Sequence, residues 1–183
     1  MSISIRELFG LPPKPDVVAG DTHTVRKVVE ALNQMEPDKA RYIAAFGYIL
    51  GRVAHADFHI SPEETAKMER ILGHYLPEAQ ALIVVQTAKM HNHLFGATEN
   101  FLVTREFARI ATREQKLELL DCLFAVSAEE DDISRAEDNE VRQISSELGL
   151  EHREYIVARA GWKDKLKLLK DLPQGPAATE FAG

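Results

Sequence analysis

The chain repeats itself at an offset of 73 residues, and this internal repeat limits the possible folds more than any other feature. It matches Ile60-Ser61 with Ile133-Ser134 and Glu64 with Glu137. The apolar positions before each turn also match: Phe46, Ile49, Leu50 and Val53 fall on Leu119, Cys122, Leu123 and Val126. Agreement in both the apolar spacing and the turn predicts that residues 46–75 and 119–148 are two copies of one helix–acidic turn–helix unit.

Apolar residues recur with a helical period along most of the chain, as in the 3-4-3 spacing of Ile43, Phe46, Leu50 and Val53. No segment alternates for long between polar and apolar residues, as a half-buried strand does. The sequence therefore predicts an all-α, multihelical domain with seven to nine helices and no three-stranded sheet. The expected helices are residues 25–36, 38–56, 62–75, 77–93, 99–110, 113–128, 135–148 and 152–172, the last one broken near Gly161.

The repeat predicts that two helices, 38–56 and 113–128, are central to the domain and pack together about a rough two-fold axis. Gly47 and Gly51 lie one turn apart in the first of these helices, so we expect another helix to approach its backbone closely. Gly149 suits the left-handed position that ends helix 135–148.

Three prolines separate the start of the chain from this helical part. Pro12, Pro13 and Pro15 cannot continue a short helix near the N-terminus, so residues 1–20 are expected to form an N-terminal arm. Residues 21–172 are expected to form the helical domain. Residues 173–183 lack periodicity and are expected to form a flexible tail.

Targeting signals and disulfides are not expected. The first 20 residues hold no apolar run of the kind that a secretory signal needs. The most apolar stretch, residues 42–51, is too short for a transmembrane helix, which needs about twenty residues. Cys122 is the single cysteine, which rules out an internal disulfide. We therefore expect a cytoplasmic protein without a transmembrane segment.

Acidic residues are concentrated in one short segment. The net charge is −7, and seven acidic residues with one arginine lie between Ser127 and Glu140. A general nucleic-acid binder would carry a basic surface instead, so this class is excluded. Crowded carboxylates repel, and Ca²⁺, Mg²⁺ or Mn²⁺ would relieve the repulsion with oxygen ligands. Glu130, Asp131 and Asp132 are the candidate ligands, although an EF-hand would need glycine at the position of Ser134.

Both turns also contain a helix-capping sequence. Ser61-x-x-Glu64 and Ser134-x-x-Glu137 fit the capping box, in which the serine oxygen and the glutamate carboxylate each accept a backbone N–H of the other residue. This purely structural role explains both serines and both glutamates. It does not explain Asp57, or the acidic residues 129–132, which precede the caps.

The two turns resemble a known motif. The segments His-Ala-Asp57-Phe-His-Ile60-Ser-Pro-Glu-Glu64 and Ala-Glu-Glu130-Asp-Asp-Ile133-Ser-Arg-Ala-Glu137 resemble the duplicated Ala-Asp-Gly-x-Ile-Ser-x-x-Glu motif of the tellurite-resistance TerB-like family. The resemblance spans about residues 38–160. It implies an all-α fold with two central helices, a link to tellurite or metal stress, and an acidic surface that holds cations, without catalytic residues. The paired acidic positions that it implies are Asp57 with Glu64, and Glu130 with Glu137.

This sequence departs from the motif at both glycines. Phe58 and Asp131 replace them, and Glu130 replaces the second aspartate. Aspartate tolerates a positive φ, whereas phenylalanine does so less readily, so we expect the first turn to take a different shape. The cation site is therefore expected in the second turn.

Other functions remain open from the sequence. The acidic turn can be a solvated helix start, or it can recognise a basic protein partner, which would make the chain an adaptor. A basic amphipathic run, Trp162–Lys170, can touch a membrane surface peripherally or dock as a terminal helix. No phosphate loop, nucleophile elbow or His-Glu-x-x-His pattern is present, so we expect no enzyme.

Overall fold

The computed structural model describes residues 32–129 and 132–166. These residues form helices α3 (Pro37–Ala54), α4 (Pro62–Leu72), α5 (Glu78–Ile110), α6 (Arg113–Ser127), α7 (Arg135–Glu147) and α8 (His152–Ala160), followed by a 3-10 helix, η1 (Lys163–Lys165). The extended pairing within the described part is one isolated bridge, Ile133–Leu166. The all-α prediction is therefore confirmed, whereas the predicted arm 1–20 and tail 173–183 lie outside the described residues.

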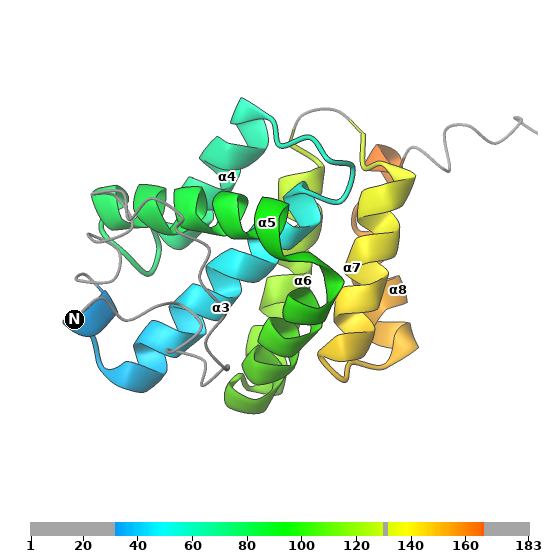
Figure 1. Cartoon of the computed structure of the whole chain (residues 1–183). Coiled ribbons are helices and arrows are strands. Elements are labelled where there is room, and N and C mark those ends of the chain that lie inside the picture. Colours follow the sequence, from blue (N-terminus) through cyan, green and yellow to red (C-terminus); the bar gives the residue numbers. More distant parts are fainter. Residues whose placement is uncertain (1–31, 130–131, 167–183) are drawn as a thin grey trace, which may run out of the picture.

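Helix α3 is the central helix of the domain. Thirteen of its eighteen residues are buried, and it packs on α4, α5, α6 and α7. Figure 1 shows α3 passing through the molecule with α5 crossing over it. A β-carbon added at Gly47 would lie 2.5 Å from Cγ1 of Val84 on α5, so glycine permits this close approach. The predicted packing of the two central helices is also present, since α6 lies against α3.

The helix ends preserve the offset of the repeat. His55 and Ala128 are the C-caps of α3 and α6, while Ser61 and Ser134 are the N-caps of α4 and α7, so each pair of caps is 73 residues apart. The packing is reciprocal as well, because α4 contacts α6 and α7 contacts α3. This arrangement is the one that a duplicated pair of helices would form.

Helix α5 differs from the sequence prediction. Two helices were expected, at 77–93 and 99–110, but one helix of 33 residues runs from Glu78 to Ile110. The connecting residues contain Gly96 and no proline, so every backbone N–H remains available and one glycine costs about 1 kcal/mol. Figure 1 shows that the helix changes direction along its length, which gives it two arms.

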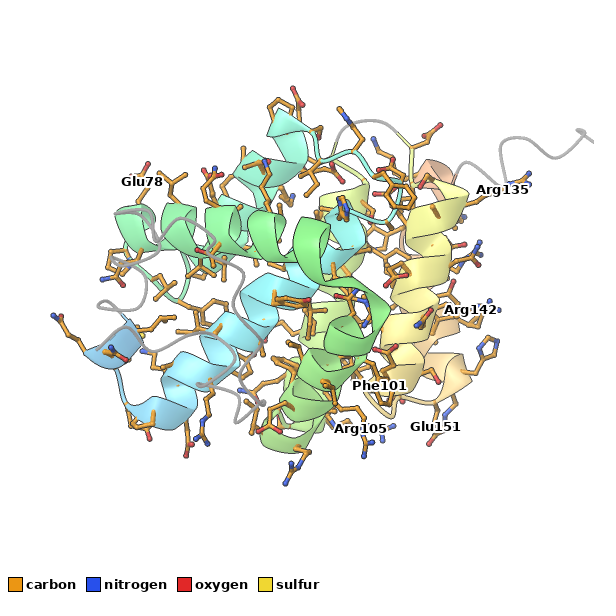
Figure 2. The ribbon with its side chains drawn as sticks, viewed as in Figure 1. Glu78, Phe101, Arg105, Arg135, Arg142 and Glu151 are labelled. Carbon is orange, nitrogen blue, oxygen red and sulfur yellow. The ribbon has the colours of Figure 1, made fainter. Side chains whose placement is uncertain are left out.

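The second arm of α5 carries part of the exposed apolar surface. Phe101 is 41% exposed, and the guanidinium of Arg105 lies 5.5 Å from the centroid of its ring. Figure 2 shows these two side chains next to each other at the surface.

In the part of the chain that the structure describes, no helix is long and apolar enough to cross a membrane.

The end of the domain docks on the second turn. Helix α8 ends at Gly161, which confirms the predicted break. The indole N–H of Trp162 donates to Asp121 at 3.0 Å, and the backbone N–H of Ile133 donates to the carbonyl of Lys165 at 2.7 Å. The described start of the basic run is therefore held against α6 and the second turn.

A buried arginine joins three helices. Arg52 of α3 is 4% exposed and forms ion pairs with Glu140 at 2.5 Å and Glu147 at 2.6 Å, both on α7. Its Nη1 also donates to the hydroxyl of Thr104 on α5 at 2.9 Å. Burial by itself would raise the pKa of Glu147, but hydrogen bonds from Arg52 and Gln143 hold that pKa below its ordinary value. The guanidinium is therefore satisfied by groups from two neighbouring helices.

We expect Arg52→Ala to lower the free energy of unfolding by about 3–5 kcal/mol, because it leaves two carboxylates without their partner. Urea denaturation measures this loss. The matched control is Arg109→Ala on α5, whose side chain is 77% exposed and pairs with Glu106; its effect should be about 0.3–0.5 kcal/mol. A loss below about 1 kcal/mol for Arg52→Ala would contradict this role.

Candidate functional site

Both predicted capping boxes are formed. The backbone N–H of Ser61 donates to Oε2 of Glu64 at 2.8 Å, and the N–H of Glu64 donates to Oγ of Ser61 at 3.0 Å. The corresponding distances for Ser134 and Glu137 are 2.8 and 3.2 Å. Both glutamates are 5% exposed, so the caps lie inside the protein rather than on its surface.

The fold brings the two capping carboxylates near each other and near Asp57. Burial is the main cause that raises the pKa of Glu64 to about 7; the charges of Glu137 and Asp57 act in the same direction, and the hydrogen bonds from Ser61 act against it. The pKa of Glu137 is also raised, first by burial and then by Asp57. Neither glutamate forms an ion pair with any residue that the structure describes. The two turns therefore form one electrostatic site, which we call the carboxylate cluster: Asp57, Glu64 and Glu137.

The first turn keeps a left-handed residue, contrary to the expectation that Phe58 would change its shape. Phe58 has φ 66. Its backbone N–H donates to the carbonyl of His55 at 3.0 Å, and the next amide, that of His59, donates to Oδ1 of Asp57 at 3.0 Å. Hydrogen bonds on both sides of Phe58 hold this conformation against the cost that a positive φ has for a residue with a β-carbon, and the side chain itself is 87% exposed.

The second turn is only partly described. Glu130 and Asp131, two of the predicted ligands, lie outside the described residues. Asp132 is half-buried and already takes part in an interaction within the protein. Among the ligands predicted from the second copy of the repeat, Glu137 lies in the carboxylate cluster. Asp57 and Glu64 of the cluster come from the first copy.

Sequence reasoning missed the basic residues that neutralise part of the second turn. Glu129 pairs with Lys67 at 3.1 Å and also with Arg70, and hydrogen bonds from these two residues lower its pKa. Lys67 and Arg70 lie three residues apart on α4, so they share one face of that helix. Their spacing was visible in the sequence, but the contact with Glu129 depends on the packing of α4 against α6.

The donor atoms of the carboxylate cluster are all carboxylate oxygens, which suit a hard cation. Within residues 32–129 and 132–166, however, no three histidine, cysteine, aspartate or glutamate side chains are arranged to hold a metal ion. Coordination of a metal would need further oxygens.

The family model described as "Tellurite resistance protein TerB" matches residues 43–160, which run from α3 to the end of α8. No curated protein and no solved structure matches the chain.

The raised pKa of Glu64 predicts a pH-dependent stability. Between about pH 4.5 and pH 7 the folded protein retains a proton that the unfolded chain releases, so this carboxyl makes the fold less stable as the pH rises. Glu64→Gln keeps the capping pattern but cannot ionise. Its stability relative to wild type should therefore increase by roughly 2–3 kcal/mol from about pH 5 to pH 8.

Urea denaturation at both pH values measures this difference. The control is Glu63→Gln, which removes an exposed neighbouring carboxylate and should follow wild type at both pH values. Equal behaviour of Glu64→Gln and wild type would show that Glu64 does not hold a proton in the folded protein.

Proposed function

The chain belongs to the TerB family of tellurite resistance proteins, and we propose that it acts as a non-catalytic binding protein whose acidic turns take up a divalent cation. The observation that carries this proposal is the carboxylate cluster. Burial raises the pKa of both glutamates, the charge of Asp57 raises both pKa values as well, and Glu137 adds to the effect on Glu64, while neither glutamate forms an ion pair with a described residue. A cation with oxygen ligands would relieve this repulsion.

The ligand set would combine both turns. In the capping box Oε2 of Glu64 accepts the serine N–H. Since the cluster alone does not form a metal site, Glu130, Asp131 and Asp132 would supply the remaining oxygens. Six or more oxygens at flexible positions favour Ca²⁺, whereas Mg²⁺ requires a stricter octahedron.

The link to tellurite resistance comes from family membership. A cation-binding domain fits a role in metal stress because it responds to an ion without needing catalytic groups. In that role, ion binding would change the charge of the acidic turns, which lie where α3, α4, α6 and α7 meet. We place this activity in the cytoplasm, following the sequence.

Cation binding is tested by calorimetry and by thermal melting with millimolar Ca²⁺, Mg²⁺ or Mn²⁺. A ligand present at 100 times its dissociation constant adds about 2.7 kcal/mol of stability. We expect wild type to bind an ion and the Asp131→Asn/Asp132→Asn variant to bind it much more weakly. A control variant, Asp38→Asn, removes an exposed acid in the first turn of α3 and should bind as wild type does. Absence of binding to wild type at millimolar ion would sink the proposal.

A second candidate function is that of an adaptor for a basic protein, and Phe58 favours it. Its ring is 87% exposed, so the apolar surface of the ring is not buried in the isolated chain. Its backbone also has a positive φ, which is unfavourable for a residue with a β-carbon. Aromatic residues of this kind often anchor protein interfaces. Asp57 lies directly beside it, so the tip of the first turn offers one apolar and one acidic group to a partner.

The conformation of Phe58 predicts how substitutions affect stability. Glycine adopts this φ freely and alanine does not, so Phe58→Gly should be more stable than Phe58→Ala by about 1 kcal/mol, as measured by urea denaturation. Little burial is lost in either variant, since the ring contacts solvent and His55 at 5.7 Å between ring centroids. Equal stability of the two variants would show that the turn changes shape when the ring is removed.

A further inference from the structure

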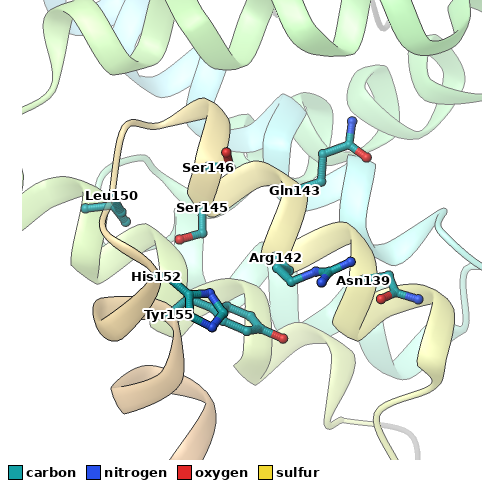
Figure 3. A pocket seen from close by; sticks show the side chains of 8 residues that line it. All are labelled: Asn139, Arg142, Gln143, Ser145, Ser146, Leu150, His152 and Tyr155. Carbon is teal, nitrogen blue, oxygen red and sulfur yellow. The ribbon is translucent and has the colours of Figure 1, made fainter.

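Helices α7 and α8 enclose a polar cleft that plays no part in the carboxylate cluster. Its volume is about 520 Å³, and the residues that line it are Asn139, Arg142, Gln143, Ser145, Ser146, Leu150, His152 and Tyr155. Figure 3 shows the polar side chains of α7 together with the overlapping rings of His152 and Tyr155 from α8. The volume is within the range of about 300–1,000 Å³ that small-molecule sites occupy.

The repeat explains how the cleft arises. At the position of Ser145 the first copy has Leu72, which is completely buried in the core. Ser145 is 2% exposed, and its hydroxyl has no hydrogen-bond partner among the described residues. A buried hydroxyl without a partner is unfavourable, and a smaller side chain also leaves space where the leucine would pack. The second copy has thus exchanged an apolar core position for a polar one that faces the cleft.

Arg142 supplies the charge of the cleft. It is exposed, and it forms no ion pair or hydrogen bond within the part of the chain that the structure describes. The equivalent residue of the first copy is Glu69, so the duplication does not explain a base at this position. The side chains of Asn139 and Ser146, on the same face of α7, also have no hydrogen-bond partner among the described residues. Several donors therefore converge on one space.

The acidic residues around the cleft already have basic partners. Asp138 is held by Arg159 at 2.8 Å and accepts the hydroxyl of Tyr155 at 2.6 Å. Glu147 pairs with Arg52, and Glu151 pairs with Arg153 at 2.8 Å. None of the residues that line the cleft is acidic. Although the whole chain carries −7, screening limits the reach of distant charges to about 8 Å at physiological salt.

We propose that this cleft binds a small organic molecule through a terminal phosphate or carboxylate group. The guanidinium of Arg142 would hold two oxygens of that group, as arginine does with planar or tetrahedral anions. Asn139, Ser145 and Ser146 would bind further oxygens or polar atoms of the ligand. The cleft is larger than a bare ion needs, and Leu150 with the ring of Tyr155 offers an apolar surface for the rest of the molecule.

The test is titration of the full chain, by calorimetry and by amide NMR shifts, with a nucleoside monophosphate, succinate and the uncharged nucleoside. We expect at least one of the two anions to bind with a dissociation constant of about 1 mM or below, and the nucleoside to bind at least about tenfold more weakly than the nucleotide. The anion that binds distinguishes a phosphate from a carboxylate ligand. Shifts should be largest at Asn139, Ser145 and His152.

Two variants that each remove one positive charge distinguish binding in the cleft from a general effect of the protein's charge. Arg142→Ala should weaken binding at least about tenfold, whereas Arg153→Ala, which removes an exposed arginine paired outside the cleft, should change it less than about twofold. Both side chains are exposed, so both variants should fold. The proposal is overturned if neither anion binds at about 10 mM, if the nucleotide binds and the nucleoside binds equally well, or if both variants behave alike.

Discussion

Because the guanidinium of Arg52 is removed from water, the carboxylates that compensate it must come from helices held at fixed positions relative to α3. Glu140 and Glu147 lie seven residues apart on α7, so the arginine contacts two turns of that helix at once. Thr104 contributes from α5. This interaction gives little net stability for its size, but it disfavours other arrangements, since any displacement of α7 would leave a buried charge unpaired.

The two copies of the repeat share their turn chemistry and differ in how their second helices are used. Both begin with a serine–glutamate cap, which holds the start of α4 and of α7 in the same local geometry. Helix α4 then supplies Lys67 and Arg70 to neutralise Glu129. Helix α7 instead supplies the partners of Arg52 and one wall of the polar cleft. The two copies thus share the same arrangement of helices and differ in the charged residues that their second helices carry.

Burial gives the carboxylate cluster its unusual electrostatics. A glutamate that caps an exposed helix would keep a pKa near its ordinary value, since water would solvate its charge. Glu64 and Glu137 are enclosed by the packing of the two helix pairs, so burial raises the pKa of both carboxyls, and the charge of Glu137 raises that of Glu64 as well. The cleft between α7 and α8 has the opposite character, with donors and no acid in its lining.

The sequence by itself determined the local features of this protein: the all-α class, the offset of 73 residues, both capping boxes and the turn at Gly149, whose φ is 73. The helical period, the caps and the turn depend on neighbours within a few residues, and the offset is visible because the same local pattern occurs twice. The sequence pattern did not decide whether residues 94–98 break a helix or whether Phe58 adopts a positive φ. Tertiary structure decided which charges meet, since the ion pairs of Arg52 with Glu140 and Glu147 join residues that are 88 and 95 positions apart. No local pattern encodes such a distance, because it results from how whole helices pack.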